Sequence, residues 1–128
     1  MTTEKILDAH VNQTHDFVSC ATTTGYSLFC LRPWERRDTY DFGGSLSLTR
    51  MLYTTNILVC VGGVVAPVAF DGNKTVVVWD MKRRKTICTM ERPQPVYELQ
   101  VTMKYIVLAT HYSVEILRLN SCTHITRF

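Results

Sequence analysis

Short apolar runs, rich in β-branched and aromatic residues and separated by turn residues, dominate the hydrophobic pattern of this chain. Residues 96–102 alternate, with Tyr97, Leu99 and Val101 on one face, as in a half-buried strand. Other runs are apolar at nearly every position, which predicts strands covered on both faces. These runs cover residues 17–21, 26–31, 57–61, 75–79, 105–109 and 113–117. No segment keeps a helical period, so the pattern predicts an all-β chain of about twelve short strands.

The predicted strands repeat as a unit of an alternating strand, two apolar strands and a polar outer strand. The first outer strand falls in residues 32–41, where Pro33 and scattered aromatics favour an irregular segment or outer strand over a short helix. Without the long loop 62–74, the units recur about every 38 residues, the length of a β-propeller blade. Trp79-Asp80 ends the inner hairpin of the second unit, where WD repeats carry this dipeptide. We therefore predict a partial β-propeller of about three four-stranded, WD-repeat-like blades, near residues 6–42, 45–92 and 96–128.

The composition is that of an ordinary globular domain, and it argues against several other classes of protein. Its 128 residues are 46% hydrophobic and 20% charged, which excludes a wholly disordered chain and a coiled coil. A net charge of +3 is too small to predict a nucleic-acid partner. The longest apolar stretch, residues 57–70, is interrupted by Pro67 and falls short of the ~20 residues of a membrane span. Early acids, Glu4 and Asp8, argue against a signal peptide and favour a cytoplasmic protein.

The candidate chemistry of the chain is sparse. The five cysteines lie mostly in apolar runs without a C-x-x-C pair, which predicts reduced thiols that serve as small core hydrophobes. The four histidines show no zinc-site spacing with any cysteine. A β-sandwich enzyme with a Cys or His nucleophile is conceivable, but no oxyanion-loop or phosphate-binding motif supports it. We therefore expect no metal, no cofactor and no enzymatic activity.

Several short motifs follow one another along the chain. They are Asn12-Gln13 with Phe17, Cys20-Ala21 with Gly25-Tyr26, Arg50-Met51-Leu52-Tyr53, Asn56-Ile57-Leu58, Val61-Gly62-Gly63, Pro67, Asn73-Lys74 with Val76, Val78 and Trp79-Asp80, then Pro95-Val96, Val101 and Tyr105-Ile106-Val107. Taken in this order, they resemble the PROPPINs, the seven-bladed phosphoinositide-binding propellers of autophagy. The similarity covers nearly the whole chain and places it at the first three blades of the family. Each motif is moderately specific, and their common order and spacing carry the resemblance.

The resemblance also implies what this chain lacks. PROPPINs bind phosphatidylinositol 3-phosphate or 3,5-bisphosphate through an F/L-R-R-G motif in a later blade. Arg36-Arg37 and Arg83-Arg84 are the adjacent arginine pairs here, and neither is followed by glycine. We therefore expect phosphoinositide binding only when later blades are present, and expect a fragment or truncated gene product. Both end blades of such a fragment would expose apolar faces that ring closure normally covers.

The resemblance nominates four residues for partner binding: Pro67, Asn73, Lys74 and Lys104. In the family, the blade-two loop and the edge between blades two and three contact the autophagy lipid-transfer partner. Pro67 lies in the apolar loop 62–74 of this chain, and Asn73 and Lys74 match the family pattern at its end. A loop folded over its own propeller is the structural alternative. Lys104 lies near a basic turn that some relatives use to bind an autophagy scaffold coiled coil.

The densest charge run consists of Lys82, Arg83, Arg84 and Lys85, between the third and fourth strands of the second unit. A solvated hairpin tip explains such a run, and contact with an anionic membrane or acidic partner is the functional alternative. Near anionic lipid each cation contributes about 1 kcal/mol, which gives an accessory attraction without a headgroup pocket.

These observations predict a non-catalytic adaptor of the PROPPIN type. It would bind autophagy proteins, the lipid-transfer partner among them, through blades two and three. We expect it in the cytoplasm, peripheral to preautophagosomal or endosomal membranes. The alternative is a fragment of a generic WD-repeat scaffold for protein interactions.

Overall fold

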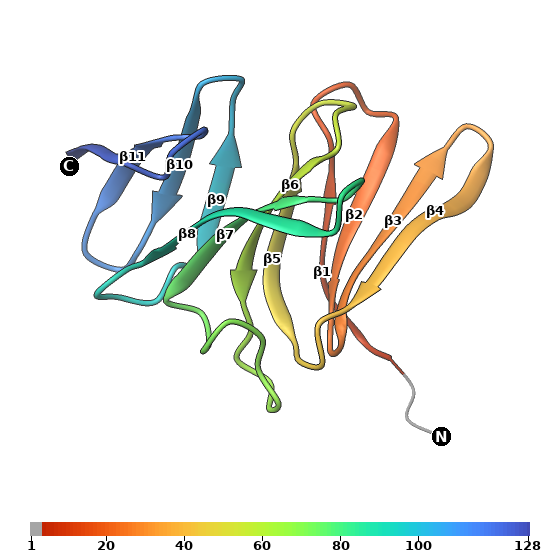
Figure 1. The fold of residues 1–128 in the computed structure, drawn as a ribbon, viewed down its shortest axis with the longest axis horizontal. Helices are drawn as coiled ribbons and strands as arrows, with labels where there is room; N and C mark the ends of the chain where they lie inside the picture. The colour runs from red at the N-terminus through yellow and green to blue at the C-terminus, as the bar shows by residue number, and fades with distance from the viewer. Residues whose placement is uncertain (1–3) are drawn as a thin grey trace.

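The structure, a computed structural model, describes residues 4–128 as twelve β-strands in three antiparallel, four-stranded sheets (Figure 1). The strands of the first sheet, blade 1, are β1 Ile6–Val11, β2 Phe17–Thr22, β3 Gly25–Leu31 and β4 Trp34–Asp41. Blade 2 contains β5 Leu46–Met51, β6 Ile57–Gly62, β7 Thr75–Asp80 and β8 Lys85–Glu91. Blade 3 contains β9 Glu98–Val101, β10 Tyr105–Ala109, β11 Val114–Arg118 and β12 His124–Arg127. The predicted all-β chain of WD-repeat-like blades is confirmed.

Each sheet follows its strands in chain order, as a propeller blade does. Figure 1 shows the blades side by side, with blade 1 on the right, blade 2 in the middle and blade 3 on the left. Strand β5 contacts β1 and β2 on one side and β9 on the other, so the first strands of the blades lie close together. Residues 34–41 form the outer strand β4, as the sequence predicted.

Blade 2 is covered on both faces, as its continuous apolar runs predicted. Every residue of β7 is buried, and successive side chains point to opposite sides of the sheet. Val77 and Trp79 therefore pack toward blade 1, while Val76 and Val78 pack toward blade 3. Two separate hydrophobic clusters result, one on each side of the middle blade.

We call the interface between blades 1 and 2 the first seam and the interface between blades 2 and 3 the second seam. The first seam is aromatic as well as aliphatic, and its buried residues are Ala21, Tyr26, Leu28, Leu46, Met51, Leu58, Cys60, Ala69, Val77, Trp79 and Met81. The second seam is aliphatic, and its buried residues are Leu48, Leu52, Val59, Val61, Val76, Val78, Val96, Leu99, Val101, Ile106, Leu108, Leu117, Leu119 and Cys122.

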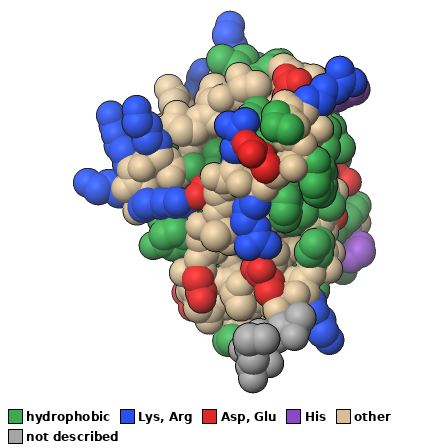
Figure 2. Space-filling model, turned by 90° about the vertical axis from the view of Figure 1, so that its right-hand side faces the viewer, with side chains coloured by type: hydrophobic (Ala, Val, Ile, Leu, Met, Phe, Trp, Pro, Cys, Tyr) green, Lys and Arg blue, Asp and Glu red, His purple; other side chains and the backbone are tan. Residues whose placement is uncertain are grey.

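The outer faces of the end blades carry partly exposed apolar side chains. On blade 3, Val107 and Ile116 face away from the second seam and are only half-buried. On blade 1, Phe29 is half-buried and Trp34, stacked on it, is 66% exposed. Figure 2 views the molecule from the blade 1 end and shows hydrophobic side chains at the surface among charged ones. The expected exposure of apolar faces is therefore present at both ends.

The loop between β6 and β7 folds back on the start of blade 2. Ser45 pairs with Val68 in an isolated bridge, and the Ser45 amide donates to the carbonyl of Pro67 at 2.8 Å. A Cβ on Gly63 would lie 1.8 Å from the Ser45 hydroxyl oxygen, so glycine is required at this close approach. Ala69 is buried in the first seam, which anchors the loop there. Val64, in the same loop, is exposed.

The expectation of five reduced cysteines is wrong for two of them. Cys88 on β8 and Cys122 in the turn before β12 form a disulfide across the second seam, with their Cα atoms 6.3 Å apart. They are separated by 34 residues in sequence, and only the packing of blade 3 on blade 2 brings them together. The other three, Cys20, Cys30 and Cys60, are buried free thiols.

Candidate functional site

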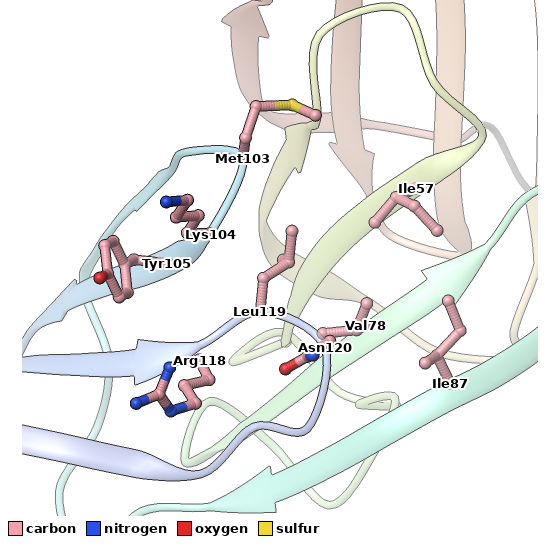
Figure 3. A pocket seen from close by; sticks show the side chains of 9 residues that line it. All are labelled: Ile57, Val78, Ile87, Met103, Lys104, Tyr105, Arg118, Leu119 and Asn120. Atoms are coloured by element: carbon pink, nitrogen blue, oxygen red, sulfur yellow. The ribbon is translucent and has the colours of Figure 1, made fainter.

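A groove with a cavity volume of about 390 Å³ opens in the second seam (Figure 3). Blade 2 contributes one wall and blade 3 the other. We call this cavity the groove. The residues that line it are Ile57, Val78, Ile87, Met103, Lys104, Tyr105, Arg118, Leu119 and Asn120. Most of these side chains are apolar, and the charged ones are cationic.

Strand ends and turns place the groove residues. Val78 faces blade 3 because alternate residues of β7 share one face of the sheet. The turn between β9 and β10 supplies Lys104, and the end of β11 supplies Arg118. The amide of Leu119 donates to the carbonyl of Lys104 at 2.9 Å, which holds the two segments together. Figure 3 shows Lys104 and Arg118 on the blade 3 wall, opposite the aliphatic side chains of blade 2.

The arrangement suits an elongated, partly apolar ligand that carries negative charge. Ile57, Val78 and Ile87 offer apolar surface, and Lys104 and Arg118 are exposed cations beside it. An amphipathic helix binds such grooves by burying its apolar face while acidic side chains meet the cations. The polar lining side chains of Lys104, Arg118 and Asn120 can each donate hydrogen bonds to an acidic group.

The structure does not bring the four predicted partner-binding residues together. Lys104 lines the groove. Pro67 lies in the exposed loop over the first seam. Asn73 and Lys74 precede β7 at the other end of the blades, where their carbonyls accept hydrogen bonds from Val96 and Arg92. The role predicted for Pro67, Asn73 and Lys74 is therefore separate in space from that of Lys104.

The basic run forms the turn between β7 and β8. Asp80 organises this turn, because its Oδ1 accepts hydrogen bonds from the amides of Lys82 and Arg83, both at 3.0 Å. These hydrogen bonds, that from Arg83 foremost, lower the pKa of Asp80. Lys82, Arg83 and Lys85 are exposed. Contact of these three side chains with an anionic surface stays a prediction.

Arg84 differs from its neighbours because it crosses the first seam. Its guanidinium pairs with Asp38 of β4 and donates to the Tyr26 hydroxyl at 2.7 Å. Tyr26 in turn donates to Asp38 at 2.7 Å and accepts from the indole of Trp79 at 3.3 Å. Burial and the bond to Asp38 raise the pKa of Tyr26, so the phenol stays protonated as a donor. Arg84 thus stabilises an interface within the molecule.

A second polar cluster connects the first strands of all three blades. Arg50 of β5 pairs with Asp8 of β1 and with Glu98 of β9, each at 3.0 Å. Its Nε donates to the carbonyl of Leu99 at 2.8 Å. Burial opposes ionisation of Glu98, but the Leu99 amide and Arg50 outweigh it and lower the pKa of Glu98. Burial, followed by the charge of Arg50, lowers the pKa of neighbouring His10.

The sequence predicted one groove residue, Lys104, and missed the other eight. Ile57 and Val78 lie in predicted strands, and alternation within a strand shows which face is apolar but not where that face opens. Arg118 follows an apolar strand as a single cation, which is common at strand ends.

Residues 4–128 contain no helix long and apolar enough to cross a membrane. Within the same range, no three His, Cys, Asp or Glu side chains are grouped so as to hold a metal ion.

Three consecutive four-stranded blades, packed through their first strands, define a β-propeller architecture, and solved structures share it. The crystal structure of Hsv2 from Kluyveromyces marxianus superposes with a TM-score of 0.85 at 20% identity, over 98% of this chain and 40% of that protein. A structure of Atg21 in complex with the coiled coil of Atg16 superposes with a TM-score of 0.76 at 16% identity, over 97% of this chain and 39% of that one.

Sequence comparison points the same way. SVP1-like protein 2 of Eremothecium gossypii is 30% identical over 116 residues, which are 88% of this chain and 28% of that protein. No family model matches the chain. The chain thus spans less than a third of the length of this curated relative. The resemblance to the PROPPIN family is confirmed, in sequence by this relative and in fold by the Hsv2 structure.

Proposed function

We propose that this chain is a non-catalytic adaptor of the PROPPIN type, which binds an autophagy protein through the groove in the second seam. The groove itself carries the proposal, because apolar walls with Lys104 and Arg118 beside them fit an acidic amphipathic helix. The complex of Atg21 with a coiled coil of Atg16 supports a helical partner for this architecture.

In this proposal, different surfaces of the molecule bind different ligands. The groove binds the protein partner, and the exposed cations Lys82, Arg83 and Lys85 add a weak attraction to anionic membranes. Specific phosphoinositide binding requires the F/L-R-R-G motif, which this sequence lacks. The proposed location is cytoplasmic and peripheral to preautophagosomal or endosomal membranes. The lipid-transfer partner is a second ligand, for the surface that contains Pro67, Asn73 and Lys74.

Binding of an Atg16 coiled-coil peptide tests the groove. A Lys104→Glu and Arg118→Glu double variant is expected to weaken binding by about tenfold or more, because it places like charges opposite acidic side chains. A Lys82→Glu and Arg83→Glu variant is the matched control, since it makes the same charge change in an exposed turn outside the groove. Equal loss in both variants would show nonspecific charge attraction and would leave a generic scaffold as the function.

Liposome flotation tests the lipid part. The chain is expected to bind anionic vesicles weakly and without preference for phosphatidylinositol 3-phosphate, and this binding is expected to fall as salt rises. Tight, headgroup-specific capture by this chain would contradict the proposal.

A further inference from the structure

The Cys88–Cys122 disulfide joins the two walls of the groove. Cys88 pairs in register with Val78, a groove residue, and follows another, Ile87. The sulfur of Cys88 lies 4.0 Å from the carbonyl oxygen of Leu119. Cys122 lies two residues beyond Asn120 in the turn of the opposite wall. The only covalent link between the blades, apart from the chain itself, therefore borders the proposed binding surface in the described structure.

The two ends of the second seam are held differently. At the first strands, Arg50 bonds to Leu99 and Glu98, so β5 and β9 are joined by hydrogen bonds and an ion pair. At the outer strand β8, the disulfide crosses directly to blade 3 beside the groove. Cleavage of the disulfide would remove the covalent link beside the groove, while the Arg50 contacts and the largely buried Arg92–Glu115 ion pair at the far end of β8 would stay in place. The oxidation state of one cysteine pair would therefore act on the groove end of the second seam.

We propose that Cys88 and Cys122 form a redox modification site that sets partner affinity at the groove, with the disulfide state binding more tightly. This inference rests on the proposed function for its biological partner, although not for the chemistry of the site. A groove held at fixed width loses less conformational freedom when a ligand binds, which favours the cross-linked state. Disulfides in cytosolic proteins are commonly transient and redox-sensing, which suits the proposed location.

The reaction is a thiol–disulfide exchange with a low-molecular-weight thiol such as glutathione. One glutathione thiolate attacks the sulfur of Cys88, which is the more exposed of the pair, and Cys122 leaves as a thiolate that takes up a proton. A second glutathione thiolate attacks the mixed disulfide, releases Cys88 and forms glutathione disulfide. The reverse reaction oxidises the two thiols at the expense of glutathione disulfide.

The remaining cysteines are poorly suited to compete. Cys60 is fully buried, and burial raises the pKa of its thiol. Burial also raises the pKa of Cys20. A raised pKa lowers the thiolate fraction, and the thiolate is the species that exchanges. Cys30 is buried as well, so all three free thiols are shielded from a thiol in solution, and the redox response is confined to the pair that spans the second seam.

The experiment compares one protein in two states. The chain is equilibrated with glutathione disulfide or with glutathione, then denatured and alkylated, and its mass is measured. Three alkyl groups are expected after oxidation, one for each free cysteine, and five after reduction. Both states are titrated with anilinonaphthalene sulfonate, an apolar anion that fits the groove chemistry, and with the Atg16 coiled-coil peptide. We expect each ligand to bind at least about threefold more weakly to the reduced state.

Two variants sharpen the result. Cys88→Ser with Cys122→Ser is expected to bind as the reduced protein does under both conditions. Cys30→Ser removes a buried thiol from blade 1 and is the matched control, which should keep the full redox response. Because the main comparison uses the unaltered chain, it stands even where a variant folds poorly.

The outcomes separate this inference from the proposed function. Five alkyl groups in the oxidised sample, or equal affinity of both ligands in the two states, would overturn the redox site. A redox-dependent dye affinity with no peptide binding in either state would support the redox site and contradict the coiled-coil partner. A redox response that persists in the double serine variant would also overturn the assignment to Cys88 and Cys122.

Discussion

The two seams of this molecule join the same blade to its neighbours by different chemistry. The first seam combines rings with a charged network, in which Trp79, Tyr26, Asp38 and Arg84 follow one another by hydrogen bonds. The second seam has an aliphatic core with ion pairs beside it, Arg50–Glu98 and Arg92–Glu115, and it opens into the groove, next to which one disulfide crosses. Interlocking rings fill the first interface, whereas branched aliphatic side chains leave apolar surface accessible at the edge of the second. The first seam therefore mainly stabilises the contact between two blades, whereas the second also offers accessible apolar surface to a ligand.

The largest expected effect breaks the first seam at its centre. Trp79→Ala removes a side chain that is 5% exposed and whose ring lies 4.9 Å from those of both Tyr40 and Phe42. We expect a loss of about 3–5 kcal/mol in the free energy of unfolding, measured by urea denaturation. Leu108→Ala in the second seam should cost about 3 kcal/mol. Should Leu108→Ala prove the more damaging, the second seam would be the stronger interface.

The next largest effect is a difference in stability between substitutions of two adjacent arginines, Arg84 and Arg83. Arg84→Ala is expected to cost about 1 kcal/mol, because it removes the charged partner of Asp38 while its partly exposed position limits the effect. Arg83→Ala, in the same turn, should change the free energy of unfolding by less than about 0.5 kcal/mol. A double-mutant cycle with Asp38→Ala measures the coupling. Equal costs for both arginines would mean that the network across the first seam contributes nothing.

A smaller effect concerns pH and the ion pair at the inner end of the second seam. The pKa of Glu98 is lowered in the folded state, so its ionised form contributes stability above its ordinary value of 4.5. This contribution is lost as pH falls below 4.5 through the folded-state pKa. Glu98→Gln should therefore show a shallower loss of stability on acidification, followed by circular dichroism between neutral pH and pH about 3. If Glu98→Gln loses stability on acidification as steeply as the unaltered chain does, Glu98 does not belong to the stabilising cluster around Arg50.

The smallest expected effect on stability concerns Lys104, which we expect to contribute to ligand binding and not to the packing of the second seam. Lys104→Ala should leave the free energy of unfolding within about 0.5 kcal/mol, because the side chain is exposed. The same substitution should weaken binding of the Atg16 coiled-coil peptide, measured by calorimetry. A large loss of stability would show that Lys104 supports the second seam structurally.

The middle blade could be predicted from sequence better than the site. Alternation and continuous apolar runs are local properties, so the strands, their repeat and the burial of β7 on both faces followed from residues close in the chain. The groove could not be predicted, because Ile57 and Leu119 meet only after blades 2 and 3 have packed. The run Lys82 to Lys85 likewise gave no sign that Arg84 alone would reach a partner on blade 1.

An all-β repeat with the motifs of the PROPPIN family could be inferred from local sequence, because hydrogen bonding and side-chain alternation within a blade depend on a few neighbouring residues. The packing of the blades, in contrast, places Lys104 beside an apolar groove, pairs Arg84 with Asp38 and joins Cys88 to Cys122. Each of these depends on how one sheet is turned against the next, and that rotation is set by the packing of whole faces.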